Sequence, residues 1–178
     1  MLAHGRKYII QPIYWKANIY RVGCLNTLPK SDFRFHYTLR VRWGECDTQG
    51  IVFNAQYLNY VEVVQAEYYR NLGVLLYDED SRKVFDVATV NVSLNYLAPA
   101  MVDNLLDIYM RVTGIGNSSI KVAVEIHRQT AEALITTGEI VYVAYDSHQR
   151  KSRPVPEDIR RKITIFEGLD SSSESSPL

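Results

Sequence analysis

The sequence lacks the features that would place it in several large classes of protein. Lys plus Arg and Asp plus Glu both number 20, so the formal charge is zero and neither sign dominates. A nucleic-acid-binding protein that works mainly by neutralising phosphates needs a basic surface, so we do not expect this class. No apolar run approaches the roughly 20 residues that cross a bilayer, so we do not expect a membrane span.

Cysteine and histidine are also scarce. The two cysteines, Cys24 and Cys46, are too few for a disulfide framework and lack the spacing of a zinc site. The four histidines are scattered along the chain. We therefore expect no metal site and no cofactor, and the cysteine usage favours a reducing, cytoplasmic compartment.

A chain of 178 residues fits a single domain with a substantial core. Residues 1–31 contain five basic and no acidic residues, but little Ser and no clear amphipathic helix. We interpret them as an N-terminal extension rather than a targeting peptide. The domain is expected over residues 32–165, and the Ser-rich residues 166–178 form a polar tail that we expect to be disordered.

The first half of the domain changes its periodicity twice. From Phe33 to Trp43 apolar and polar residues alternate, which predicts a half-buried strand. Gly44 ends this pattern, and residues 45–53 have no period, which indicates a loop. Apolar residues then recur at helical spacing between Asn54, the expected N-cap, and Gly73, so we expect a helix over about 55–72.

Four further strands are expected at about 88–96, 106–112, 120–127 and 140–145. The segments 114–117 and 129–132 are typical of hairpin turns. A strand, one helix and four hairpin-linked strands exclude a doubly wound parallel sheet. The sequence therefore predicts an α+β fold in which an antiparallel five-stranded sheet wraps around one long helix. Such a sheet leaves two open edges that a second subunit could cover.

The loop before the helix contains the residues most suited to chemistry. Glu45, Cys46 and Asp47 place two carboxylates and a thiol ahead of a helix N-terminus. A helix start offers unpaired N–H groups and partial positive charge, which can polarise a carbonyl, and a nearby carboxylate could then attack it or activate water. On these residues alone, Asp47 could equally cap a turn, Cys46 could be a small buried residue, and Glu45 is most simply a solvated loop charge.

The stretch from Val41 to Glu62, VRWGECDTQGIVFNAQYLNYVE, resembles the signature of the hydroxybenzoyl-CoA thioesterase family. In that family an aromatic-ended strand leads into Asp, Gly, a hydrophobic pair and a helix that begins Tyr-Leu-x-Tyr-x-Glu. Three later stretches, at 92–103, 117–120 and 153–157, resemble further landmarks of the family in the right order. The resemblance covers about residues 33–163.

The resemblance implies a hotdog fold and a homodimer or homotetramer with active sites at the dimer interface. It implies hydrolysis of an acyl-CoA thioester, with Asp47 as nucleophile or general base. The N–H near Asn54 is expected to polarise the thioester carbonyl, and Ser118 and Ser119 are expected near the coenzyme A end. The positions that we expect to contribute to substrate binding are Gly50, Tyr57, Glu62, Ser118 and Ser119.

This chain departs from the family pattern in two places. Asn54 stands where members that resemble the Tol–Pal-associated branch commonly carry His, so a His-assisted mechanism is not available. The turn at 114–117 lacks the basic residues of some relatives, and Arg111, Lys121 and Arg128 are the candidates to replace them. The alternatives are a non-catalytic acyl-CoA-binding hotdog protein and a hydratase-type enzyme. Asp47 in the motif favours hydrolysis.

Overall fold

The computed structural model describes residues 28–76, 85–131 and 133–169. Most of the expected N-terminal extension and of the expected C-terminal tail lies outside these residues. No helix among the described residues has the length and apolar character needed to cross a bilayer. The elements in chain order are η1 (Lys30–Asp32), β1 (Phe35–Arg40), η2 (Trp43–Glu45), α1 (Gln56–Asn71), β2 (Val87–Tyr96), β3 (Leu105–Ile115), β4 (Ser119–Arg128), η3 (Gln129–Ala131), β5 (Ala133–Asp146), β6 (Lys151–Ser152) and α3 (Glu157–Glu167).

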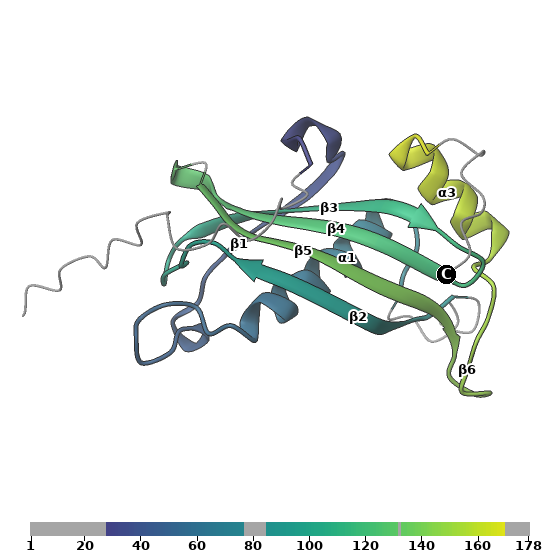
Figure 1. Cartoon of the computed structure of the whole chain (residues 1–178), viewed down its shortest axis with the longest axis horizontal. Helices are drawn as coiled ribbons and strands as arrows, with labels where there is room; N and C mark the ends of the chain where they lie inside the picture. The colour runs from purple at the N-terminus through teal and green to yellow at the C-terminus, as the bar shows by residue number, and fades with distance from the viewer. Residues whose placement is uncertain (1–27, 77–84, 132, 170–178) are drawn as a thin grey trace, which may run out of the picture.

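The strands form one antiparallel sheet with α1 packed against it (Figure 1). The strand order is β1-β3-β4-β5-β2, and the short β6 pairs with β5. β1 and β2 are therefore the edges of this path, and every pairing is antiparallel. This confirms the predicted architecture of one long helix against an antiparallel sheet.

The helix forms where its apolar stripe predicts it. Tyr57, Val61, Val64 and Tyr68 are each at most 3% exposed, because this side of α1 packs on the sheet. α1 ends at Asn71, and Gly73 follows with a φ of +70° that favours glycine. The sheet contributes the apolar side chains of alternate positions to the same core: Leu106, Ile108, Met110, Val112, Ile120, Val122, Val124, Ile126 and Ile140.

The first strand is shorter than its alternation predicts. β1 ends at Arg40, and Trp43 lies in η2 with 85% of its surface exposed. The reason is a reciprocal cap, because the Glu45 carboxylate accepts hydrogen bonds from the Arg42 backbone N–H and its Nε. This contact turns the chain before Trp43 can continue the strand. The prediction of a strand that extends to Trp43 was therefore wrong at this end.

The strand β5 is longer than the sequence predicts, since it begins at Ala133 rather than near Ile140. Thr136, Thr137 and Gly138 are buried within this strand. Because they are not apolar, they do not continue the hydrophobic pattern that predicts a strand. Gly138 lies opposite Leu94 on β2. A Cβ atom at Gly138 would stand 2.8 Å from the Ser93 carbonyl oxygen and closer still to the Leu94 side chain. Glycine therefore allows the two strands to approach each other here.

The helix α3 was not expected. Its Ile159 and Ile163 are buried, and Gly168 ends it with a φ of +66°. Glu167 is 3% exposed, and its Oε1 accepts hydrogen bonds from the Tyr68 hydroxyl at 2.7 Å and the Val112 N–H at 3.0 Å. The packed domain thus continues past residue 165, where the polar tail was expected to begin.

Glu167 gives a prediction for stability against pH. Burial raises the pKa of Glu167, although the hydrogen bonds from Tyr68 and Val112 and the charge of Arg111 oppose the rise. Between the pKa of the unfolded state and that of the folded state, the folded protein binds a proton that the unfolded chain has lost. As the pH rises through this range, the free energy of unfolding therefore falls. Glu167→Gln keeps an oxygen acceptor but cannot ionise.

We expect Glu167→Gln to be at least as stable as the wild type at pH 7. As the pH falls to about 4, the wild type should gain stability relative to the variant, because its carboxyl becomes neutral. Urea unfolding of both proteins at the two pH values measures this difference. A variant that is clearly less stable at pH 7 would show instead that the ionised Glu167 stabilises the fold.

Candidate active site

The loop between η2 and α1 is a closed turn that carries Asp47. The Asp47 N–H donates to the Ile51 carbonyl at 2.9 Å, and the Gly50 N–H donates to the Asp47 carbonyl at 3.0 Å. Gly50 has a φ of +76°, a conformation that side chains other than glycine rarely adopt. Its part in the site is therefore to close this turn, which fixes the backbone of Asp47.

The Asp47 side chain is half-buried, and its two oxygens differ. Oδ1 accepts a hydrogen bond from the Gln49 N–H at 2.8 Å, which is the turn-capping contact that the sequence left open as an alternative. Oδ2 has no hydrogen-bond partner among the described residues. A carboxylate with one oxygen fixed and the other free is oriented yet still able to accept a proton or attack a carbonyl carbon.

The start of α1 leaves one backbone donor without an acceptor. The Asn54 side-chain oxygen accepts from the Ala55 N–H at 2.9 Å, and the Gln56 N–H donates to the Phe53 carbonyl. The Asn54 N–H itself has no acceptor within the described ranges. Because it lies at the positive end of the helix, it can polarise a carbonyl oxygen. The Tyr96 hydroxyl holds this position by donating to the Asn54 carbonyl at 3.1 Å.

Glu45 is not the solvated loop charge that the sequence suggested. It is 9% exposed, and its Oε2 accepts the Tyr60 hydroxyl at 2.7 Å in addition to the Arg42 N–H at 2.7 Å. Burial opposes ionisation, but the hydrogen bonds from Arg42 and Tyr60 hold the pKa of Glu45 below its usual value. Burial and the neighbouring carboxylate raise the pKa of Tyr60, which therefore remains a hydroxyl donor.

The expected substrate-binding residues of α1 lie in different surroundings. Tyr57 is 3% exposed and packs edge-on against the rings of Tyr60 and Tyr96, at centroid distances of 6.0 and 5.2 Å. Its visible role is to pack the helix start against β2. Glu62 is exposed and lines a pocket between α1 and the sheet.

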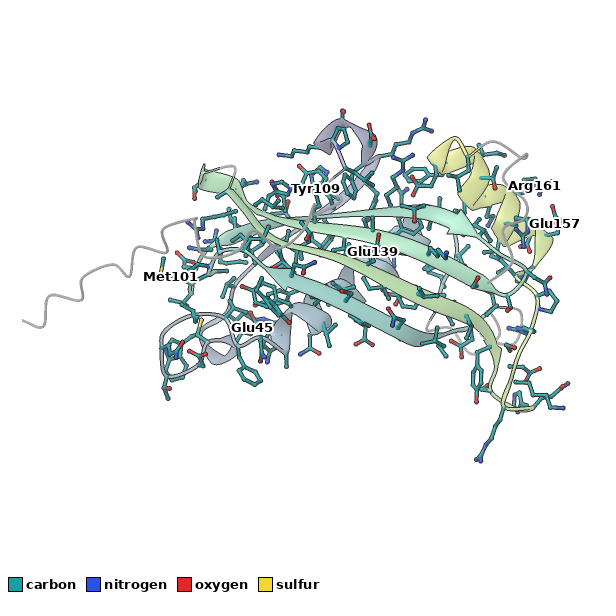
Figure 2. All side chains as sticks on the ribbon, viewed as in Figure 1. Glu45, Met101, Tyr109, Glu139, Glu157 and Arg161 are labelled. Carbon is teal, nitrogen blue, oxygen red and sulfur yellow. The ribbon has the colours of Figure 1, made fainter. Side chains whose placement is uncertain are left out.

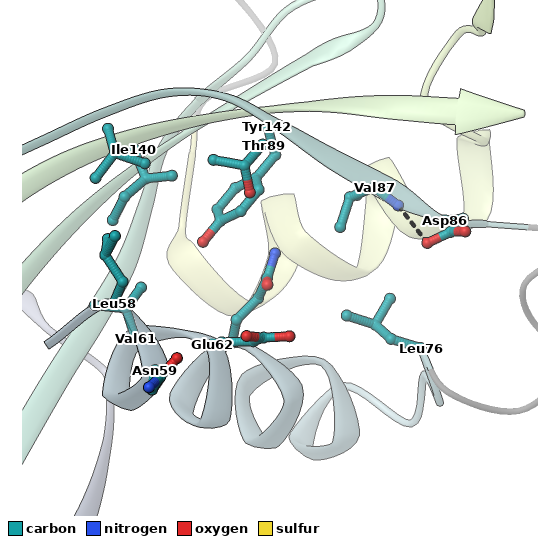
Figure 3. A pocket seen from close by; sticks show the side chains of 12 residues that line it. Leu58, Asn59, Val61, Glu62, Leu76, Asp86, Val87, Thr89, Ile140 and Tyr142 are labelled. Atoms are coloured by element: carbon teal, nitrogen blue, oxygen red, sulfur yellow. Dashed lines mark hydrogen bonds between the residues drawn. The ribbon is translucent and has the colours of Figure 1, made fainter. Parts of the chain in front are cut away.

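This pocket has a volume of about 570 Å³ and mixes apolar with polar walls (Figure 3). Leu58, Asn59 and Glu62 lie on the helix side, and Thr89 and Tyr142 lie on the sheet side. Its remaining lining residues are Val61, Gln65, Leu76, Asp86, Val87, Val92 and Ile140. The side-chain nitrogen of Gln65 is buried and has no hydrogen-bond partner in the part of the chain that the structure describes. Gln65, a polar residue on the buried side of α1, is the sequence signal that could have indicated this wall.

Ser118 and Ser119 lie at the other end of the sheet from Asp47. β3 begins at Leu105, beside the loop contact between Ile51 and Met101, and ends at Ile115, next to the serine turn. Eleven residues of strand span roughly 33 Å. Figure 2 shows this separation, with Glu45 and Met101 at one end and Glu157 and Arg161 at the other. One chain therefore does not bring Asp47 and the two serines together.

The three candidate phosphate-binding residues differ in their contacts with other groups of the protein. Arg111 lies 3.4 Å from an Asp32 oxygen and 4.0 Å from a Glu167 oxygen. Arg128 donates to the Pro99 carbonyl at 2.6 Å. Lys121 pairs with Gly114 across the hairpin, and its side chain is exposed near the serine turn. It is therefore the best placed of the three to meet a phosphate there.

Comparisons with known proteins show which family the chain belongs to. The thioesterase-like superfamily model matches residues 41–163. The acyl-CoA thioester hydrolase YbgC of Escherichia coli O6:H1 is 25% identical over 127 residues, which are 70% of this chain and 92% of that protein. The acyl-CoA thioesterase YbgC of Haemophilus influenzae is 25% identical over 133 residues, 72% of this chain and 93% of that protein.

Solved structures give the same fold. A 1,4-dihydroxy-2-naphthoyl-CoA thioesterase from Synechocystis has a TM-score of 0.67 at 21% identity, over 72% of this chain and 94% of that one. A Thermus thermophilus thioesterase in complex with coenzyme A and zinc has a TM-score of 0.66 at 23% identity, over 78% and 98% of the two chains. The family match begins just after β1 and includes the Asp47 loop, α1 and the strands from β2 to β6, so the chain is a hotdog-fold protein of the thioesterase-like superfamily.

Proposed function

We propose that the protein is an acyl-CoA thioesterase of the hydroxybenzoyl-CoA thioesterase type, which hydrolyses an acyl-CoA to the free acid and coenzyme A. The observation that carries the proposal is the turn that holds Asp47 directly ahead of the start of α1. Among the described residues, one Asp47 oxygen and the Asn54 N–H have no hydrogen-bond partner. The names of the YbgC relatives and of the coenzyme A complex support the same reaction.

The geometry supports a division of roles between two groups. The Asn54 N–H acts only as a hydrogen-bond donor. It stabilises the negative charge that develops on the thioester oxygen as a nucleophile adds to the carbonyl carbon. Asp47 either attacks the carbonyl carbon, forming an anhydride as the C–S bond breaks, or takes a proton from a water that attacks. In the first case water then cleaves the anhydride. Both routes release the acid and the coenzyme A thiol.

One prediction of this proposal concerns Asp47. We expect Asp47→Asn to lower kcat by roughly a hundredfold or more, because an amide is neither a base nor a competent nucleophile. Release of the thiol from short, medium, long and aromatic acyl-CoA substrates measures activity and acyl preference together. Circular dichroism and urea unfolding verify that the variant is folded. A folded Asp47→Asn protein within a few-fold of wild-type activity would remove Asp47 from the mechanism.

A further prediction of this proposal concerns the neighbouring thiol. Cys46 is a free, partly buried cysteine that packs against the core and bridges to Val52. The three described histidines have other surroundings: His36 stacks on Tyr109, His127 pairs with Glu125 on β4, and His148 lies in the turn between β5 and β6. We therefore expect Cys46→Ser to keep kcat within about threefold and to lose modest stability at most. An inactive but folded Cys46→Ser protein would assign the chemistry to the thiol instead.

The two ends of the sheet can meet only in an assembly. β2 is an edge strand, and apolar side chains on it and beside it remain exposed, with Val90 at 57%, Val92 at 38% and Leu58 at 43%. An antiparallel pairing of β2 with β2 of a second copy would cover this margin. It would also reverse the second chain, so that the Tyr96 end of one β2 lies beside the Val87 end of the other.

This pairing would bring the Asp47 loop of one copy to the pocket and serine turn of the other. Tyr96 bonds to Asn54 at the first end, whereas Val87 and Glu62 line the pocket toward the second. The acyl group would then occupy the 570 Å³ pocket of one subunit while the partner supplies the carboxylate. The active unit is thus a homodimer, alone or within a tetramer.

A mixed dimer tests the shared site. Glu62→Trp fills the pocket from an exposed position on α1, and Asp47→Asn removes the carboxylate. Each homodimer should be inactive, but a mixed dimer contains one site with both parts intact. We expect it to have about half of the wild-type activity, because two-fold symmetry provides two equivalent sites.

The two variants are co-expressed with different affinity tags, and the mixed dimer is isolated through both. The control is a dimer of wild-type chains with Asp47→Asn/Glu62→Trp double-variant chains, in which each site has one defective part and should be inactive. Activity in the control but not in the mixed dimer would place the carboxylate and pocket in one chain. A fully active monomer in light scattering would refute the shared site altogether.

A further inference from the structure

The Asp47 loop is tied to α1 by one buried side-chain contact whose effect on the reaction goes beyond folding. The Glu45 carboxylate accepts the Tyr60 hydroxyl at 2.7 Å, and Tyr60 is 2% exposed on the core side of the helix. The same carboxylate accepts the Arg42 N–H and Nε at 2.7 and 2.8 Å. Glu45 therefore joins the start of the loop to the body of the helix.

The main chain of Glu45 also holds the end of the loop. Its carbonyl oxygen accepts a hydrogen bond from the Phe53 N–H at 2.9 Å. Glu45 therefore holds the start of the loop through its side chain and the end of the loop through its main chain. Asp47 lies two residues after Glu45, and Asn54 lies one residue after Phe53. Both groups assigned to the reaction are thus within two residues of the contact that Glu45 fixes.

We propose that Glu45 and Tyr60 are positioning residues for thioester hydrolysis, which hold the Asp47 carboxylate and the Asn54 N–H in a fixed relation. The inference rests on the proposed function. Neither residue touches the reacting atoms in this assignment. Their effect is on the orientation of the two groups that do, and a misplacement of about 1 Å in such groups can cost about a hundredfold in rate.

The strength of the contact suits this task. A hydrogen bond to a charged partner in a buried site is stronger than a neutral one and more directional. Arg42 is 79% exposed in its side chain, so its ion pair with Glu45 is screened by water and fixes the loop less firmly. Loss of the Tyr60 hydroxyl would leave the loop closed on itself but free to move against α1.

The molecule contains a matched control for this proposal at the other end of the same helix. Tyr68 is 1% exposed and donates to the Glu167 carboxylate, also at 2.7 Å. The two tyrosines are eight residues apart, or about 12 Å along the helix axis. Tyr68→Phe therefore removes a tyrosine–carboxyl hydrogen bond of the same length and similar burial that does not reach the Asp47 loop.

The experiment compares Tyr60→Phe, Glu45→Gln and Tyr68→Phe in the full-length protein. We expect Tyr60→Phe and Glu45→Gln to lower kcat at least tenfold with KM within about threefold of wild type. Tyr68→Phe should keep kcat within about twofold despite a similar loss of stability in urea. The double variant Tyr60→Phe/Glu45→Gln should be no slower than the slower single variant, since the two residues act as one unit.

Hydrogen exchange gives a second readout that does not depend on activity. Tyr60→Phe should speed exchange at the Asp47 and Val52 amides, which bond to the Ile51 and Ala100 carbonyls, while Tyr68→Phe leaves them unchanged. Equal kcat in the two tyrosine variants, or a change confined to KM, would overturn the proposal. If Asp47→Asn proved fully active, the proposed function would fail instead, while faster loop exchange in Tyr60→Phe alone would still show the tether.

Discussion

The structure depends on one requirement, which is that a single helix must bury its apolar side against a single sheet. The 16-residue α1 presents Tyr57, Val61, Val64 and Tyr68 to the strands. Long strands satisfy the requirement, because β3 and β5, with 11 and 14 residues, cross the whole length of the helix. The same length separates the two ends of the sheet, so the fold that creates the core also divides the candidate site.

Sequence patterns predicted the parts of this fold in which burial and periodicity coincide. The stripe of α1, the alternation of β4 and the hairpin turns belong to this group. The pattern failed where polar residues are buried. Thr136 and Thr137 on β5 and Glu167 on α3 are each almost inaccessible, but their composition is that of an exposed segment. Their surroundings come from strands distant in the sequence, and no local pattern encodes those contacts.

The candidate site shows the same division. Asp47, Gly50 and Asn54 follow from a motif in one continuous stretch, and the structure places all three on one closed turn and helix start. Glu45 was predicted to be a solvated charge because nothing nearby in the sequence indicates a donor. The donor is Tyr60, which lies 15 residues later in the second turn of α1. The pocket and the serine turn required the sheet topology, since only the strand order reveals which end of the molecule each one occupies.

The exposure of Trp43 has a consequence for spectroscopy. The chain contains two tryptophans, and Trp43 is 85% exposed in the short helix that leads into the Asp47 turn. The buried aromatic side chains of the described core are tyrosines and phenylalanines, including Tyr60, Tyr68, Tyr69 and Phe85. The indole of Trp43 therefore emits from a polar environment in the folded chain, and its emission is sensitive to whatever comes to rest on the loop rather than to the packing of the core.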